Sequence, residues 1–138
     1  ISNKRQLFEI LAQKAEELTG FPQAQVLATL EGREDLGSTG LGNGIAIPHG
    51  KIQGLKGVTA VFARLDEPID FDSVDDQPVD LVVMLLAPVG AGADHLKALS
   101  RVARLLRTES VTDSLRAETD TERLHDILTA PVESTYAA

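Results

Sequence analysis

Apolar residues at helical spacing near the start of the chain predict two helices. Over residues 3–18 the apolar positions recur every three or four residues, which places them on one face of a helix. They are Leu7, Phe8, Ile10, Leu11, Ala15 and Leu18. Ser2 is a suitable N-cap for this helix, and Gly20 is a suitable residue to end it. Pro22 suits the first turn of a second helix over residues 22–31.

The middle of the chain contains the shorter and more continuous apolar runs that are typical of strands. Residues 58–65 are apolar enough on both faces to predict an internal strand. Residues 81–87 are all apolar and predict a buried central strand. Between these runs, residues 66–68 (Asp-Glu-Pro) predict a turn, and residues 69–72 predict a short edge strand.

The last third of the chain returns to helical spacing. The pattern predicts helices over residues 94–107, 111–117 and 121–128, followed by a frayed tail over residues 131–138. Two helices, three or more strands and then further helices predict an α/β sandwich, in which helices cover both faces of a mixed β-sheet. We therefore expect one domain over residues 1–130.

A glycine-rich run leads to a histidine. Five of the eleven glycines lie within residues 37–51, GSTGLGNGIAIPHGK, and this density indicates positive φ angles or the close approach of another group. Ile45 and Ile47 predict a short strand that Pro48 ends, because proline has no N–H to donate. We expect His49 to follow in a surface loop, where a partner can reach it.

His49 in such a place suits nucleophilic chemistry. Imidazole has an ordinary pKa of about 6.5, so at neutral pH most of it is uncharged and carries one free lone pair. When a backbone carbonyl holds the proton on the other ring nitrogen, this group can take up a phosphoryl group and pass it on. The alternative interpretation of His49 is an ordinary solvated loop residue.

Composition excludes several classes of protein. With 43% apolar and 25% charged residues, the chain is typical of a soluble globular domain. It has no cysteine, which excludes disulfides and thiolate sites and fits a reducing compartment. The net charge of −8 argues against a nucleic-acid-binding protein. It fits either a partner with a basic contact face or simple solubility.

No apolar run is long enough to predict membrane insertion, and the start of the chain has no signal-peptide pattern. We therefore expect a cytoplasmic protein. Because the chain begins with Ile1 rather than methionine, we also expect a segment to precede it.

The run GSTGLGNGIAIPHGK closely resembles the active-site segment of enzyme IIA proteins of the fructose/mannitol class, in the bacterial phosphoenolpyruvate-dependent phosphotransferase system. The nitrogen-regulatory branch is the most similar, and the resemblance extends from Lys4 to about Leu128. It implies that His49 is phosphorylated, on Nε2, by a histidine phosphocarrier protein (HPr-like). No metal or cofactor is implied, because side chains and backbone donors can supply the electrostatics.

Arg33 is predicted to lie in a connection that returns toward His49. A guanidinium suits a phosphoryl group because its planar fork can donate two charge-assisted hydrogen bonds. The resemblance implies that Arg33 assists phosphoryl transfer. A surface ion pair with Glu34, Asp35 or another acid is the alternative from the residues themselves.

His95 is the second candidate site residue. It falls in the first turn of the predicted helix 94–107, in line with Leu99 and Val102, and so points toward the body of the protein. The helix dipole disfavours its protonation there, and His95 could donate a hydrogen bond to a phosphoryl group on His49. The resemblance implies this role, and the alternative is a partly buried histidine that only caps the helix. His125 is interpreted as a surface residue.

Phosphorylation could serve two purposes. In the nitrogen-regulatory branch, the phosphoryl state is a signal that changes binding to regulatory or potassium-transport proteins. In the sugar branch, the group passes to a membrane-associated IIB domain and on to fructose or mannitol. The sequence contains no IIB, carrier or membrane domain, and this favours the regulatory branch.

Metal binding is a third hypothesis, with His49, His95 and an aspartate as ligands. The sequence has no helix-spaced ligand pair such as HExxH. A group of aspartates in residues 70–80 does not match the spacing of an EF-hand calcium loop. We interpret these aspartates as solvated turn and cap residues.

Overall fold

The computed structural model of the chain describes residues 1–90, 92–120 and 122–123. Contacts divide the chain into two compact units, residues 1–99 and residues 100–138. Each unit is described by itself below.

Two helices begin the first unit, as predicted. Helix α1 covers Lys4–Thr19, and the side chain of Asn3, not of the predicted Ser2, caps it by accepting a hydrogen bond from the Gln6 amide. Gly20 ends α1 in the left-handed conformation, with φ of 80°. Helix α2 covers Gln23–Glu34 and therefore extends three residues beyond the predicted end at residue 31.

A mixed sheet forms the centre of the first unit, with β5 (Val79–Pro88) as its central strand. Strands β2 (Ile45–Ala46) and β3 (His49–Ile52) both pair with β5 in parallel. Strand β4 (Thr59–Ile69) pairs with β5 antiparallel, and β1 (Gly40–Gly42) pairs with β2 antiparallel. Parallel and antiparallel pairs thus occur together, as the predicted mixed sheet requires.

Strand β4 differs from its prediction in two ways. It continues through Asp66, Glu67 and Pro68, where a turn was expected, with an irregularity in the pairing between Arg64 and Ile69. Among the described residues it pairs with β5 alone, so it is an edge strand and not an internal one. Edge strands tolerate proline because one side of the strand needs no hydrogen-bond donors.

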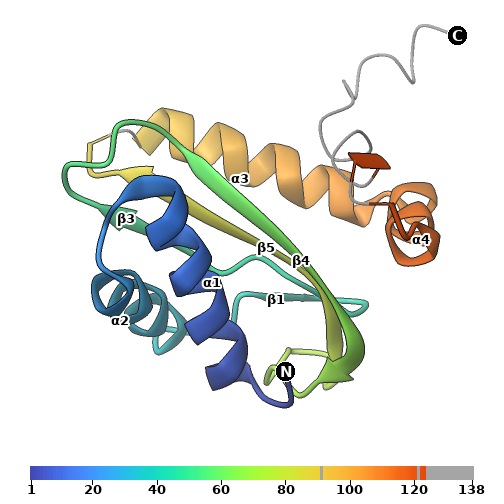
Figure 1. Ribbon diagram of the computed structural model, residues 1–138. Coiled ribbons are helices and arrows are strands. Elements are labelled where there is room, and N and C mark those ends of the chain that lie inside the picture. Colours follow the sequence, from blue (N-terminus) through green and yellow to red (C-terminus); the bar gives the residue numbers. More distant parts are fainter. Residues whose placement is uncertain (91, 121, 124–138) are drawn as a thin grey trace, which may run out of the picture. The chain divides into compact units, whose positions relative to one another are not determined.

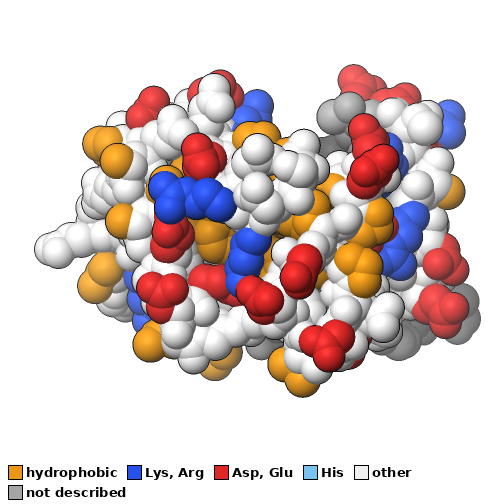
Figure 2. All heavy atoms as spheres, turned by 90° about the horizontal axis from the view of Figure 1, so that it is seen from below, with side chains coloured by type: hydrophobic (Ala, Val, Ile, Leu, Met, Phe, Trp, Pro, Cys, Tyr) orange, Lys and Arg blue, Asp and Glu red, His pale blue; other side chains and the backbone are white. Residues whose placement is uncertain are grey.

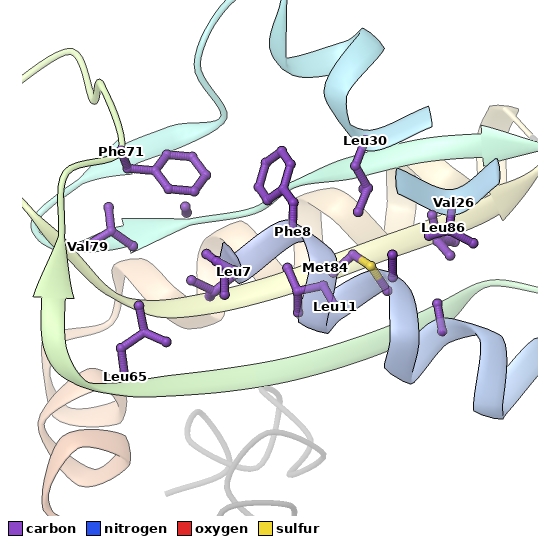
Figure 3. Packing of buried hydrophobic residues seen from close by; sticks show 14 of the residues in the cluster. Leu7, Phe8, Leu11, Val26, Leu30, Leu65, Phe71, Val79, Met84 and Leu86 are labelled. Carbon is purple, nitrogen blue, oxygen red and sulfur yellow. The ribbon is translucent and has the colours of Figure 1, made fainter. Parts of the chain in front are cut away.

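The core of the first unit lies between the sheet and the first two helices, which lie side by side on one of its faces (Figure 1). Figure 3 shows Leu11 of α1 beside Met84 of β5, and the rings of Phe8 and Phe71 close together. These two rings meet edge to face, with centroids 5.9 Å apart. Leu18, assigned by the pattern to the buried face of α1, is exposed.

Helix α3 covers Gly92–Arg107 and is thus two residues longer than predicted. Its first turns belong to the first unit, where His95 is buried but Leu96 is exposed. In the second unit, α4 covers Glu109–Ala117, close to the predicted helix 111–117. The rest of the predicted helix 121–128 beyond residues 122–123, together with His125 and the tail, lies outside the described residues. No helix in the described part of the chain is both long and apolar enough to cross a membrane.

Candidate active site

The glycine-rich run folds into a tight hairpin. Strands β1 and β2 are joined at Asn43 and Gly44, which have φ of 57° and 81°, and two positive φ angles in succession are typical of a type I′ turn. The Asp75 carboxylate accepts hydrogen bonds from the amides of Asn43 (2.9 Å) and Gln77 (3.1 Å). These backbone donors, Asn43 first, lower the pKa of Asp75 and fasten the hairpin to the loop before β5.

His49 is the first residue of strand β3, not a loop residue as predicted. Pro48 interrupts the ladder, but its carbonyl still accepts a hydrogen bond from the Leu85 amide (2.9 Å), and parallel pairing with β5 resumes at once. Alternation along β3 then directs His49 and Lys51 to one face and Gly50 to the other. His49 is half-buried, whereas Lys51 is exposed.

A backbone hydrogen bond fixes the imidazole of His49. Its Nδ1 lies 2.8 Å from the carbonyl oxygen of Ile47, and because a carbonyl can only accept, Nδ1 carries the proton when the ring is neutral. The lone pair is then on Nε2, pointing away from this contact. The geometry favours Nε2 as the nucleophilic atom.

His95 lies against this ring. The two ring centroids are 5.5 Å apart, with an angle of 78° between the ring planes. His95 is only 7% exposed, and its Nε2 is buried without a hydrogen-bond partner. Burial lowers the pKa of His95, and positive charge on His49 and Lys51 lowers it further. The neutral imidazole of His95 is thus favoured, and its buried Nε2 would gain a hydrogen bond from a polar group placed next to it.

Arg33 is placed differently from its prediction. It belongs to the last turn of α2 and not to a connection, and its Nη1 donates to the carbonyl of Gly37 at 2.9 Å. The structure therefore brings His49 and His95 together, while the described contact of Arg33 is with the start of the glycine-rich run.

Sequence reasoning missed two features of this site. Lys51 shares a strand face with His49 and acts electrostatically on His95, and the period-two alternation of a strand after Pro48 would have indicated this. Gly50 allows α2 to approach β3, because a Cβ there would lie 2.5 Å from Cγ2 of Thr29.

The residues do not form a ligand set for a metal ion. Within the described ranges, no three histidine, aspartate or glutamate side chains are placed to hold one. In the part of the chain that the structure describes, His49 and His95 thus have no third ligand of the kind that a metal site needs.

Comparison with known proteins gives consistent results. A family model described as "Phosphoenolpyruvate-dependent sugar phosphotransferase system, EIIA 2" matches residues 1–130. The nitrogen regulatory protein of Bradyrhizobium diazoefficiens is 53% identical over 131 residues, covering 95% of this chain and 86% of that protein. The PTS system fructose-specific EIIA component of Haloferax volcanii is 42% identical over 101 residues, covering 73% of this chain and 66% of that protein.

A solved structure has the same fold. The crystal structure of nitrogen regulatory protein IIA-Ntr from Neisseria meningitidis matches with a TM-score of 0.90 and 40% identity, covering 94% of this chain and 88% of that one. This match confirms the predicted α/β architecture. With the family model spanning nearly the whole chain, the protein belongs to the EIIA 2 family of the phosphoenolpyruvate-dependent sugar phosphotransferase system.

Proposed function

We propose that the protein is a nitrogen-regulatory enzyme IIA that accepts a phosphoryl group on Nε2 of His49. The donor is the phosphohistidine of a small HPr-like carrier protein, and the resulting phosphorylation state controls partner proteins. The observation that carries the proposal is the hydrogen bond from Nδ1 of His49 to the Ile47 carbonyl, which leaves the Nε2 lone pair free. Family membership supports the same chemistry.

The transfer balances without a further reactant. The Nε2 lone pair of His49 forms the new N–P bond while the N–P bond of the donor breaks, and the electron pair of that bond returns to the donor ring. The Nδ1 proton stays against the Ile47 carbonyl throughout, so the acceptor needs no base to remove a proton. Catalysis then consists of in-line positioning and charge stabilisation.

Two further residues stabilise the phosphoryl group in this proposal. The ring of His95 contacts the ring of His49, and its Nε2 has no hydrogen-bond partner. When the proton of the neutral His95 ring is on Nε2, this atom donates a hydrogen bond to a phosphoryl oxygen. Arg33 uses one N–H on the Gly37 carbonyl, and a guanidinium has five, so its other donors remain for phosphoryl oxygens. The start of α3 adds backbone N–H groups.

The regulatory branch is favoured by similarity to nitrogen regulatory proteins over nearly the whole chain. The alternative is a sugar-transport enzyme IIA that passes its phosphoryl group to a IIB domain for fructose or mannitol uptake. That candidate rests on the 42% identity with a fructose-specific EIIA component.

Intact mass spectrometry tests the proposal. We would incubate the protein with phosphoenolpyruvate, enzyme I and the histidine phosphocarrier protein, with His49→Ala as control. One acid-labile phosphoryl group on the wild type and none on His49→Ala is the expected result. An unmodified wild-type protein of native fold would contradict it. Transfer of the group to an added fructose or mannitol IIB domain would favour the alternative.

A further inference from the structure

A continuous series of hydrogen bonds connects Glu34, at the end of α2, to the ring of His49. The carboxylate of Glu34 accepts from the Thr39 hydroxyl (2.6 Å) and from the Thr39 amide (3.0 Å). The Thr39 carbonyl accepts from the Ile47 amide (3.1 Å). The Ile47 carbonyl in turn accepts from Nδ1 of His49 (2.8 Å). Each bond fixes the backbone that makes the next one.

This series lies almost wholly out of water. The Glu34 side chain is 7% exposed, and Thr39 and Ile47 are buried. The Lys4 ammonium, 2.7 Å from the carboxylate, balances its charge. A buried ion pair contributes little net stability, since removing two charges from water offsets their attraction. Stability alone therefore does not explain a carboxylate at this position.

The neighbouring Glu31 shows the contrast. It lies one turn earlier on α2 and pairs with the exposed Arg5 of α1 at 3.2 Å. Both glutamates join α1 to α2, but Glu34 also holds both polar groups of Thr39. Only Glu34 of these two thus acts on the glycine-rich run.

We propose that Glu34 is a positioning residue for the phosphoryl acceptor: through Thr39 it aims the Ile47 carbonyl at Nδ1 and keeps His49 in the tautomer whose Nε2 can attack. The expected effect on the rate of phosphoryl uptake rests on the proposed function, whereas the expected effect on the His49 tautomer does not. Without the Glu34 contact, Thr39 loses the two hydrogen bonds that hold it to α2, the Ile47 carbonyl is no longer held in place, and the two neutral tautomers of His49 become mixed.

Two pairs of variants test this role in the full chain. Glu34→Gln replaces one acceptor oxygen by a donor, and Glu31→Gln is its matched control on the same helix. Thr39→Val removes the hydroxyl at nearly constant shape, and Thr39→Ser restores it. The tautomer of His49 is read from the ¹⁵N shifts of its ring nitrogens, and phosphoryl uptake is timed by mass spectrometry.

We expect the two ring ¹⁵N signals of His49 to converge in Glu34→Gln and Thr39→Val, and to keep the wild-type separation in Glu31→Gln. Phosphoryl uptake should slow by about 10- to 100-fold in Glu34→Gln, the cost of a small misplacement of a reacting group. Thr39→Ser should regain most of what Thr39→Val loses. If Glu34→Gln does not fold, the two Thr39 variants decide alone.

The possible failures are distinguishable. Unchanged ring signals and unchanged uptake in folded Glu34→Gln and Thr39→Val would overturn the positioning role and leave the proposed function standing. The opposite case combines two results: the wild-type protein takes up no phosphoryl group, and the His49 ring signals converge in Glu34→Gln and Thr39→Val. This combination would overturn the proposed function and uphold the positioning of His49.

Discussion

Two imidazoles of unlike surroundings meet at the candidate site. His49 is half-buried and bonded through Nδ1 to the Ile47 carbonyl, whereas His95 is buried with a free Nε2. Burial, and then positive charge on His49 and Lys51, lower the pKa of His95 and favour its neutral form. The pair can therefore place a nucleophile and a neutral hydrogen-bonding group side by side at neutral pH.

Removing the charge of Lys51 should raise the pKa of His95. In Lys51→Gln we expect the titration midpoint of His95 to move toward the ordinary value of 6.5. It should remain below that value, since burial is the larger cause of the lowered pKa. NMR of the ring C–H signals of His95 measures this midpoint. Lys56→Gln, a change at another exposed lysine, is the control and should leave the midpoint unchanged. An unaltered His95 midpoint in Lys51→Gln would show that Lys51 does not act on it.

The same lowered pKa gives stability a definite pH dependence. The unfolded chain binds a proton near pH 6.5, but folded His95 does not until the pH is lower. His95 therefore contributes stability above its ordinary pKa that is lost as the pH falls through its folded pKa. Urea unfolding between pH 7 and pH 5 should show a smaller loss of unfolding free energy for His95→Gln than for the wild type; an equal loss would contradict this assignment.

At the residue scale, the sequence was enough to select His49 and His95 as candidates, but not to predict which element holds His49. Helical phase was enough to predict that His95 points inward. The strand position of His49 was missed because Pro48 was interpreted as an end of pairing. Proline lacks a donor but keeps its acceptor, which Leu85 uses. Arg33 was misplaced because nothing local indicates that α2 continues to Glu34.

At the scale of elements, the contact of α2 with β3 depends on the absence of a side chain at Gly50. A Cβ at this position would lie 2.5 Å from Cγ2 of Thr29. The elements with strong patterns, α1, β5 and α3, were predicted within about two residues, as is usual for long periodic segments. The short strand predicted from Ile45 and Ile47 is confirmed as β2, whereas its partner β1 was missed, because a three-residue strand with two glycines has no apolar alternation.

Gly50→Ala should therefore destabilise the fold by about 1–3 kcal/mol, the usual cost of an extra methyl group in a packed contact. Thr29→Ser in the same chain removes the opposing methyl group and should restore much of this loss. Denaturant unfolding measures both changes. Equal stability of Gly50→Ala and the wild type would show that α2 and β3 can move apart enough to accommodate the added methyl group.

Gly32 provides the opposite case on α2. A Cβ there would meet nothing within 4 Å, and the residue lies within the helix. Gly32→Ala should stabilise the protein by roughly 0.5–1 kcal/mol, because glycine costs conformational entropy in a helix. Loss of stability in the same unfolding assay would contradict this expectation.

At the scale of the molecule, the net charge bears on the class of partner that the protein can bind. The chain carries a net charge of −8. Figure 2 shows one face, on which acidic side chains are interspersed with basic ones, and the described side chains seen there form no continuous basic band. The long-range field therefore repels polyanions.

We expect no retardation of duplex DNA by the protein in gel electrophoresis at physiological salt. Neutralising phosphates requires clustered lysines and arginines, and lowering the salt should not reveal binding. Binding that appears on lowering the salt would contradict this and indicate a basic surface elsewhere on the molecule.

The central position of β5 has a consequence for the unfolded chain. Strands β2, β3 and β4 all pair with β5, which supplies seven uncharged apolar residues in succession between Asp80 and Pro88. Such a segment readily forms intermolecular cross-β contacts once it is released, and the flanking charge and proline only partly oppose this. Heating at high concentration should therefore end in aggregation faster than refolding, with an apparent melting temperature that depends on scan rate. We therefore expect β5, the central strand of the sheet, to limit the reversibility of thermal unfolding.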